Sequence, residues 1–262
     1  MRKFGVKLFS DNFIKCPELT RSCIDLIQKG VFDYLELMAL PNSFEDTKKQ
    51  ASEMVKGKMQ VVVHAPHSSQ GMNTGDKDAY QNNRHLLESA QRFADLLEAE
   101  IIILHAGNNP QERYLDETIR QFKLINDERI AVENLPQYCP IYKTLFHGTS
   151  PQEMARIKAE TGCKFCYDFC HGICASNSFG RDRYEDMKAY VALKPDMYHL
   201  CDNDWDGMDD GHMHYGEGSY NLAKIVSYID KDGIVTMETG RDAPKDMVPR
   251  IRDVEFLHKI CA

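Results

Sequence analysis

Residues 61–67, Val-Val-Val-His-Ala-Pro-His, form an apolar run that ends in two potential metal ligands, His64 and His67. Histidine, aspartate and glutamate are side chains that bind zinc or manganese at neutral pH. Ligand-type residues recur at or just beyond the ends of further short segments: IIILH (His105), IAVE (Glu133), FCYDFCH (Asp168, His171), MYH (His199), DGHMH (Asp210, His212, His214) and VTME (Glu238). In a parallel α/β barrel all strand C-termini converge on one mouth, so ligands scattered along the sequence become neighbours. The sequence therefore predicts a multinuclear metal enzyme.

Apolar runs and amphipathic stretches alternate from end to end of the chain. This alternation predicts one domain over residues 1–262, a single (β/α)8 TIM barrel with its site at the C-terminal ends of the strands. The predicted strands are Phe4–Leu8, Tyr34–Met38, Gln60–His64, Ile101–Leu104, Arg129–Glu133, Lys164–Asp168, Met197–Leu200 and Ile234–Glu238. The predicted helices are Pro17–Lys29, Phe44–Lys56, Asp76–Leu97, Gln111–Asn126, Ser150–Thr161, Tyr184–Leu193, Asn221–Ile229 and Pro244–Ile260. Ser150, followed by Pro151 and Glu153, has the pattern of a helix start.

Composition places few limits on function. The chain has 262 residues, and a hydrophobic content of 42% is enough for a full core. The net charge of −8 argues against a broad nucleic-acid surface, although bound metals would supply positive charge for a phosphate. An odd count of nine cysteines, without a signal-peptide pattern or an apolar run of spanning length, predicts a cytoplasmic protein with free thiols and no membrane partner.

The sequence resembles the endonuclease IV-like and xylose isomerase-like barrels, often grouped as AP endonuclease family 2. The resemblance covers almost the whole chain and rests on PHSSQGMN, HAG after IIIL, VEN, YDFCH, HLCDND followed by DGHMHYGEG, and MET. Endonuclease IV binds three zinc ions through nine ligands, and each has a counterpart of matching type here. The match implies a first metal at His67, His105 and Glu133, a second bridged by Glu133 and completed by Asp168, His199 and Glu238, and a third at His171, Asp210 and His212. It implies two or three divalent ions, zinc foremost, with manganese or iron as alternatives.

The residue pattern gives part of this site independently. Asp168 and His171 are predicted to span a strand end and the turn after it, so their side chains can face different metals. Asp210 and His212 are two residues apart, which places them on the same side of an extended segment. A bridging role suits Glu133, because each of its two oxygens can bind a cation.

Other ligand-type residues are expected to have lesser roles. His64 is expected to support the site without binding metal, because the match falls on His67. A run of acidic residues is expected to form a solvated turn: Asp202, Asp204, Asp206 and Asp209. The spacing of Cys163, Cys166, Cys170 and Cys174 suggests an iron–sulfur or zinc cluster. Cys166, however, lies inside a predicted strand and differs in strand parity from Cys163, so buried free thiols are the favoured interpretation.

Two reactions fit this scaffold. The resemblance to endonuclease IV implies that a metal-bound hydroxide attacks a phosphodiester. Sugar isomerases and epimerases of the same superfamily would instead use one manganese-like ion and a carboxylate that moves a proton, at Glu133, Asp168, His199 and Glu238. We favour hydrolysis because the five further ligands are also present, and we assign catalysis to Glu133, Glu238 and His171. A metal-binding barrel that is not an enzyme is a third interpretation.

Three departures from endonuclease IV bear on the substrate. Gln70 stands where that enzyme has its DNA-penetrating tyrosine, and MALPNSFED replaces its Arg-rich loop. Glu36 in FDYLELM resembles the sugar-isomerase branch. We therefore expect a small-molecule phosphoester or a sugar phosphate as the substrate, ahead of damaged DNA.

Overall fold

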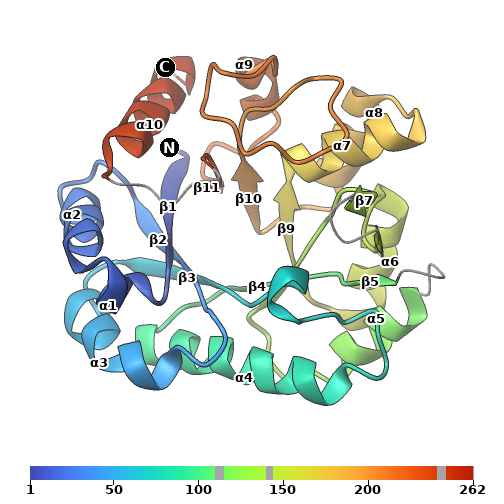
Figure 1. The fold of residues 1–262 in the computed structure, drawn as a ribbon. Coiled ribbons are helices and arrows are strands. Elements are labelled where there is room, and N and C mark those ends of the chain that lie inside the picture. The colour runs from blue at the N-terminus through green and yellow to red at the C-terminus, as the bar shows by residue number, and fades with distance from the viewer. Residues whose placement is uncertain (110–114, 140–143, 241–245, 262) are drawn as a thin grey trace.

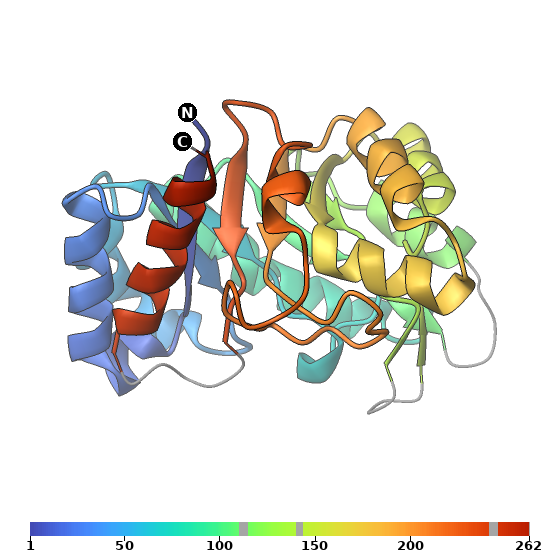
Figure 2. The same cartoon turned by 90° about the horizontal axis from the view of Figure 1, so that it is seen from above.

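The computed structural model describes residues 1–109, 115–139, 144–240 and 246–261. Eight parallel strands close into a barrel in the order β1-β11-β10-β9-β6-β4-β3-β2, and helices surround it (Figures 1 and 2). The strands are β1 (Lys3–Phe9), β2 (Tyr34–Met38), β3 (Gln60–His64), β4 (Ile102–His105), β6 (Ile130–Glu133), β9 (Lys164–Asp168), β10 (Met197–Leu200) and β11 (Ile234–Met237). Each predicted strand is found within one residue of its expected bounds, and the (β/α)8 barrel is confirmed.

The interior of the barrel is apolar at one end and ionisable at the other. Successive residues of a strand point to opposite faces, so alternate side chains fill the barrel. An apolar cluster from six of the strands occupies the interior: Tyr34, Val62, Ile101, Ile103, Ala131, Cys166 and Met197. Toward the C-terminal strand ends the inward side chains become histidines and carboxylates, and they therefore gather at the mouth.

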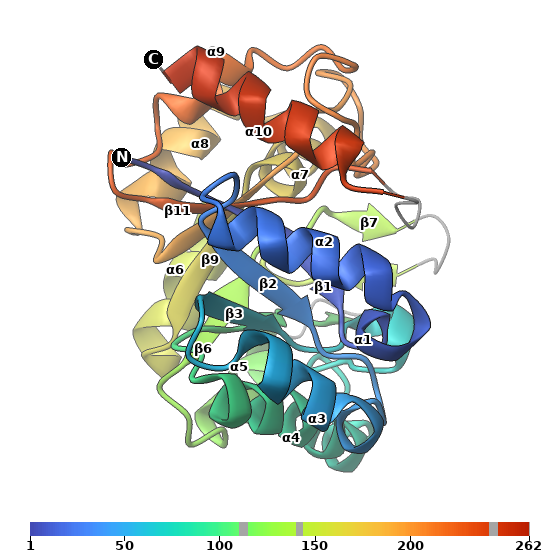
Figure 3. The ribbon, with the colours of Figure 1, turned by 90° about the vertical axis from the view of Figure 1, so that its left-hand side faces the viewer.

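The outer layer matches the predicted helices, with different ends. These are α2 (Pro17–Gln28), α3 (Phe44–Val55), α4 (Tyr80–Leu97), α5 (Leu115–Lys123), α6 (Pro151–Thr161), α8 (Arg183–Ala192), α9 (Leu222–Val226) and α10 (Val248–Cys261). The first predicted residues of α5 and α10, 111–114 and 244–245, lie outside the described residues. The ring of Phe4 on β1 lies 5.3 Å from that of His258 on α10, so the two chain ends meet where the barrel closes (Figure 3).

Local side-chain hydrogen bonds explain how the helices begin. The side chain of Ser150 accepts a hydrogen bond from the backbone nitrogen of Glu153, at 3.2 Å, so the predicted start of α6 is confirmed. The predicted start of α4 at Asp76 is wrong, because its side chain accepts from the nitrogen of Asp78 and forms a turn before Tyr80.

Several elements were missed by the sequence analysis. A helix, α7 (Phe169–Phe179), stands where a turn was expected after β9, because the Asp168 side chain caps it by accepting from the nitrogen of His171, at 2.7 Å. Most of α7 is buried on every side, so it lacks the apolar stripe that reveals a surface helix. Also unpredicted are the short helices α1 (Asn12–Lys15) and η1 (Ser68–Gln70), and the sheet of β5 (Asn108–Asn109), β7 (Tyr138–Cys139) and β8 (Thr144–Phe146).

Candidate metal centre

Four ligand-type side chains meet at the centre of the mouth. Glu133 and Asp168 end the neighbouring strands β6 and β9, His199 is the last but one residue of β10, and Glu238 follows β11. One ligand atom from each lies within 4.8 Å of the others. Nδ1 of His199 is 3.3 Å from Oε1 of Glu133, 3.4 Å from Oε1 of Glu238 and 4.0 Å from Oδ2 of Asp168. This quartet is compact enough to surround a single ion.

The two oxygens of Glu133 face different histidines. Oε1 is 3.3 Å from Nδ1 of both His171 and His199. Oε2 is 3.2 Å from Nε2 of both His64 and His105. A carboxylate placed in this way can bridge two cations, as the sequence predicts for Glu133.

A third group forms around Asp210, in the long segment after β10. Its Oδ2 contacts Nε2 of His212 and lies 3.4 Å from Nε2 of His171. The expectation of an extended segment here is wrong, because His212 is in the left-handed region at φ 47°. Nδ1 of His212 donates to the carbonyl oxygen of Glu238, at 2.6 Å, and this bond turns the ring toward Asp210.

The segment that carries Asp210 is ordered by a buried carboxylate. Asp202 was expected to lie in a solvated turn, and this is wrong, since it is 1% exposed. Its side chain accepts hydrogen bonds from the backbone nitrogens of Gly216, at 2.8 Å, and of Gly218 and Tyr220, both at 3.2 Å. His214 turns away from the centre and bonds to Asp253 on α10, at 2.8 Å.

His64, and not His67, lies among the other ligand-type side chains, which differs from what the sequence match implies. Nε2 of His64, expected in a supporting role, forms a ligand-type group with His105 and Glu133. Among the described residues, the groups with ligand atoms within 4.8 Å of one another do not include His67. The His67 ring instead stacks on that of His105, with centroids 5.2 Å apart. Gln70 accepts a hydrogen bond from the backbone nitrogen of His67, at 2.9 Å, so it orders this loop.

The orientation of the histidine rings fits a bound cation. Nδ1 of His64, His171 and His212 bonds to the carbonyl oxygens of Ala65, Asn134 and Glu238, and a carbonyl can only accept. Nδ1 therefore carries a proton, and Nε2 of each ring faces a carboxylate oxygen. Backbone carbonyls orient metal-binding imidazoles in this way. Apart from the Cys166 sulfur beside Glu133 and His199, the donor atoms of the centre are nitrogen and oxygen, which suits zinc or manganese.

Two further residues hold the centre in place. Nε2 of His199 donates to Oε2 of Glu36, at 2.9 Å, and Thr236 Oγ1 donates to the same oxygen, at 2.6 Å. Nζ of Lys7 lies 3.1 Å from Oε1 of Glu36 and also contacts Glu238. Lys7 was missed by the sequence analysis. Its signal was a lysine at an inward position of the apolar run FGVKLF.

The pKa values of two central carboxyl groups, Glu133 and Asp168, shift in opposite directions. Burial opposes ionisation of Glu133, yet His199 and His105 hold its pKa well below the ordinary value. Burial raises the pKa of Asp168 well above its ordinary value, and the negative charge of Glu133 contributes. A divalent cation beside these carboxyl groups would offset the repulsion and favour the ionised form of Asp168.

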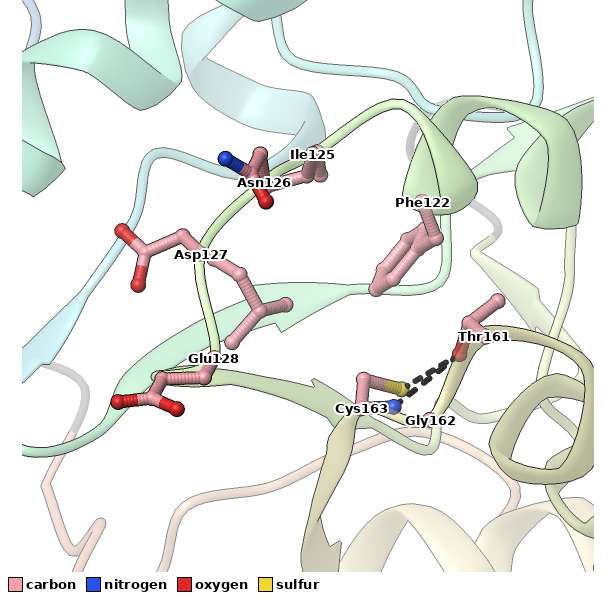
Figure 4. A pocket seen from close by; sticks show the side chains of 9 residues that line it. Phe122, Ile125, Asn126, Asp127, Glu128, Thr161, Gly162 and Cys163 are labelled. Carbon is pink, nitrogen blue, oxygen red and sulfur yellow. Dashed lines mark hydrogen bonds between the residues drawn. The ribbon is translucent and has the colours of Figure 1, made fainter.

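A separate hollow of about 270 Å³ lies at the opposite ends of the strands (Figure 4). Its lining includes Phe122, Ile130 and Cys163, which lie at or before the starts of β6 and β9. Within it, Thr161 Oγ1 donates to the Cys163 sulfur, at 3.0 Å. Its lining has two carboxylates, Asp127 and Glu128, but none of the histidines that converge at the mouth, so we place the functional site at the mouth.

The fold and the site define a (β/α)8 barrel with a cluster of side chains of the metal-ligand type at the C-terminal strand ends. The chain belongs to the xylose isomerase-like TIM barrel family, whose model matches residues 25–259. It is 23% identical, over 93% of its length, to an uncharacterized protein of Methanocaldococcus jannaschii, of which it covers 86%.

Two solved structures share the fold at low sequence identity. A D-tagatose 3-epimerase-like protein has a TM-score of 0.71 at 19% identity, over 99% of this chain and 97% of that one. Endonuclease IV from Thermus thermophilus has a TM-score of 0.67 at 16% identity, over 99% and 98%. An epimerase-like protein and an endonuclease thus share this barrel, and the fold does not choose between their reactions. No helix in the described part of the chain is long and apolar enough to cross a membrane.

Proposed function

We propose that this protein is a metal-dependent phosphoester hydrolase with a multinuclear metal centre. The observation that carries the proposal is the position of Glu133, whose Oε1 faces Nδ1 of His199 and whose Oε2 faces Nε2 of both His64 and His105. A mononuclear isomerase site needs only one of these sides. Relatives of both kinds exist within the fold, so the proposal depends on the site and not on the fold.

The ligand-type residues form three groups, and each group would make one metal subsite. Glu133, Asp168, His199 and Glu238 would hold the central ion. Glu133 and His105 would hold a second, with His67, as the resemblance implies, or with His64, whose Nε2 is closer to Glu133. His171, Asp210 and His212 would hold a third. Divalent cations here would lower the pKa of water and neutralise charge on a phosphoryl group.

The protein's own side chains fix the geometry before substrate arrives. Glu36 directs Nδ1 of His199 toward the quartet, and the carbonyl groups orient the other imidazoles. Lys7 places a positive charge beside Glu238. Burial lowers the pKa of Lys7, but Glu238 and Glu36 outweigh this and raise it well above the ordinary value. Preorganised ligands of this kind need no rearrangement during the reaction. We propose a small phosphoester or a sugar phosphate as the substrate.

The second candidate is a sugar or sugar-phosphate isomerase or epimerase. The quartet of Glu133, Asp168, His199 and Glu238 favours it, because these four ligand atoms are mutually close enough for one ion. Glu133 and Glu238 would then move the substrate proton.

The deciding experiment is an assay of metal-free protein reloaded separately with zinc and manganese. Substrates are a chromogenic phosphodiester, sugar phosphates, abasic duplex DNA and a panel of ketoses. Glu133→Gln is the inactive variant, and Glu160→Gln, the same change at an exposed carboxylate on α6, is the matched control. The proposal expects phosphoester cleavage that Glu133→Gln abolishes and Glu160→Gln retains. Sugar interconversion without any phosphoester cleavage would overturn it in favour of the second candidate.

A further inference from the structure

Three buried cysteines gather beside the metal centre. Cys170 and Cys174 lie one turn apart on α7, and Cys201 follows β10. Their exposed fractions are 0%, 0% and 2%. The sulfur of Cys170 interacts with the thiols of both Cys174 and Cys201. Residues four apart in a helix share a face, so α7 directs two sulfurs to one point.

Asp210 joins this sulfur cluster to the histidines. Its Oδ2 faces His171 and His212, whereas its Oδ1 lies 3.9 Å from the sulfur of Cys201. One ligand atom from each of Cys170, Cys201 and Asp210 lies within 4.8 Å of the other two. The side chain of Asp210 is 16% exposed, which opens one edge of the otherwise buried cluster to solvent.

Buried donors converge on the sulfur atoms. Nδ2 of Asn203 lies 3.3 Å from the sulfur of Cys170 and 3.6 Å from that of Cys174. The hydroxyl of Tyr220 donates to the Cys170 sulfur at 3.5 Å. Both donor residues are buried, at 3% and 7% exposed. A buried cysteine that only packs behaves as a small apolar group and needs no such donors, whereas a thiolate does.

We propose that Cys170, Cys201 and Asp210 form the core of a site for a thiophilic cation, zinc or a softer metal ion, and that Cys174, whose thiol interacts with Cys170, completes the site when the ion binds. Three thiolates and one carboxylate are a four-ligand set suited to tetrahedral zinc. Each coordinated thiol releases one proton on binding. The site is distinct from the nitrogen and oxygen centre, and the second oxygen of Asp210 connects the two.

The structure also changes which cysteines belong together. The sequence spacing groups Cys163 and Cys166 with Cys170 and Cys174. Cys163 instead lies at the opposite end of β9, and Cys166 fills the barrel interior. Cys201, distant in sequence, takes their place.

The test is a titration of metal-free, reduced protein with cadmium, followed by ultraviolet sulfur-to-cadmium charge-transfer absorption. Wild type should develop this band, and Cys201→Ser should lose about one third of it, since thiolates are the absorbing ligands. Cys16→Ser, an exposed thiol, and Cys23→Ala, a buried thiol on α2, should leave the band unchanged. A missing band, or one that Cys201→Ser does not reduce, overturns the proposal.

X-ray absorption of zinc-saturated wild type provides a measurement that needs no variant. A zinc–sulfur shell at about 2.3 Å is expected beside nitrogen and oxygen at about 2.0–2.2 Å. A spectrum with nitrogen and oxygen alone sinks the sulfur site and leaves the hydrolase proposal standing. A sulfur shell in a protein without phosphoesterase activity supports the sulfur site and contradicts the hydrolase proposal.

Discussion

Replacing Glu36 with glutamine tests whether this residue positions His199, a metal ligand in the proposed centre. Oε2 of Glu36 accepts from both His199 Nε2 and Thr236, so the amide oxygen of a glutamine should take that place. Its NH2 group then faces Nζ of Lys7, which lies 3.1 Å from the other oxygen of Glu36. The imidazole thus keeps its tautomer but loses its negative partner, and the lysine loses one of its two carboxylates.

The expected loss can be estimated from these contacts. A hydrogen bond to a charged group contributes about 1.5–3 kcal/mol, and a neutral one about 0.5–1.5 kcal/mol, so the exchange costs His199 roughly 1–2 kcal/mol. Removing the outer partner of a metal-bound histidine typically lowers metal affinity 10–100-fold, or about 1.4–2.8 kcal/mol. We therefore expect Glu36→Gln to bind zinc about 10–100-fold more weakly while remaining folded.

Zinc affinity is measured by competition of metal-free protein with a chromophoric chelator, with circular dichroism to verify folding. Tyr34→Phe is the matched control, because the Tyr34 hydroxyl bonds to Thr236 at 2.8 Å in the same interior network without touching His199. The control should bind zinc as wild type does. A folded Glu36→Gln protein with wild-type zinc affinity refutes the positioning role.

Three other outcomes are expected. Glu133→Gln should lower the metal content and abolish phosphoester cleavage, because it removes one charge from two ligand groups; elemental analysis that shows full metal content contradicts the bridge. Metal-free protein should lose stability as pH rises from 6.5 to about 10. Burial opposes protonation of His212, but Asp210 raises its pKa to about 10. The stability that the protonated ring contributes is therefore complete below its ordinary pKa of 6.5 and is lost as pH rises through about 10. Urea unfolding at several pH values measures this, and a stability that is constant or increases over that interval argues against the pairing. Gly5→Ala should cost about 1–3 kcal/mol, because the added Cβ overlaps the buried Tyr34 ring, and an unchanged denaturation midpoint would exclude that overlap.

The barrel could be predicted because its pattern is local. Each strand is a short apolar run, and the period-two alternation inside it decides which side chains face the mouth. The failures have equally local causes. The turn at Asp76 makes α4 begin later than the sequence pattern predicts. Helix α7 is buried on most sides, so it shows no amphipathic pattern.

Side-chain partnerships across the barrel could not be predicted in this way. Lys7 pairs with Glu36 because β1 and β2 are in register at those positions, and Glu36 reaches His199 from a strand more than 160 residues earlier in the chain. The choice between His64 and His67 likewise depends on how the chain turns after β3. A residue-by-residue match gives the ligand types but not these contacts.

Lys7 also changes the interpretation of Glu36. Glu36, His64 and Glu238 bring ligand atoms within 4.8 Å of one another and would by themselves be a further candidate metal site. The ammonium group of Lys7 contacts both carboxylates of this trio, so the chain supplies a cation there itself. Unpaired buried carboxylates repel one another strongly, and a fixed lysine removes this cost without requiring another ion. Glu36 therefore serves as a counterion for Lys7 and a partner for His199. The feature that resembles a sugar isomerase in the sequence is, in the folded protein, part of the support for the metal centre.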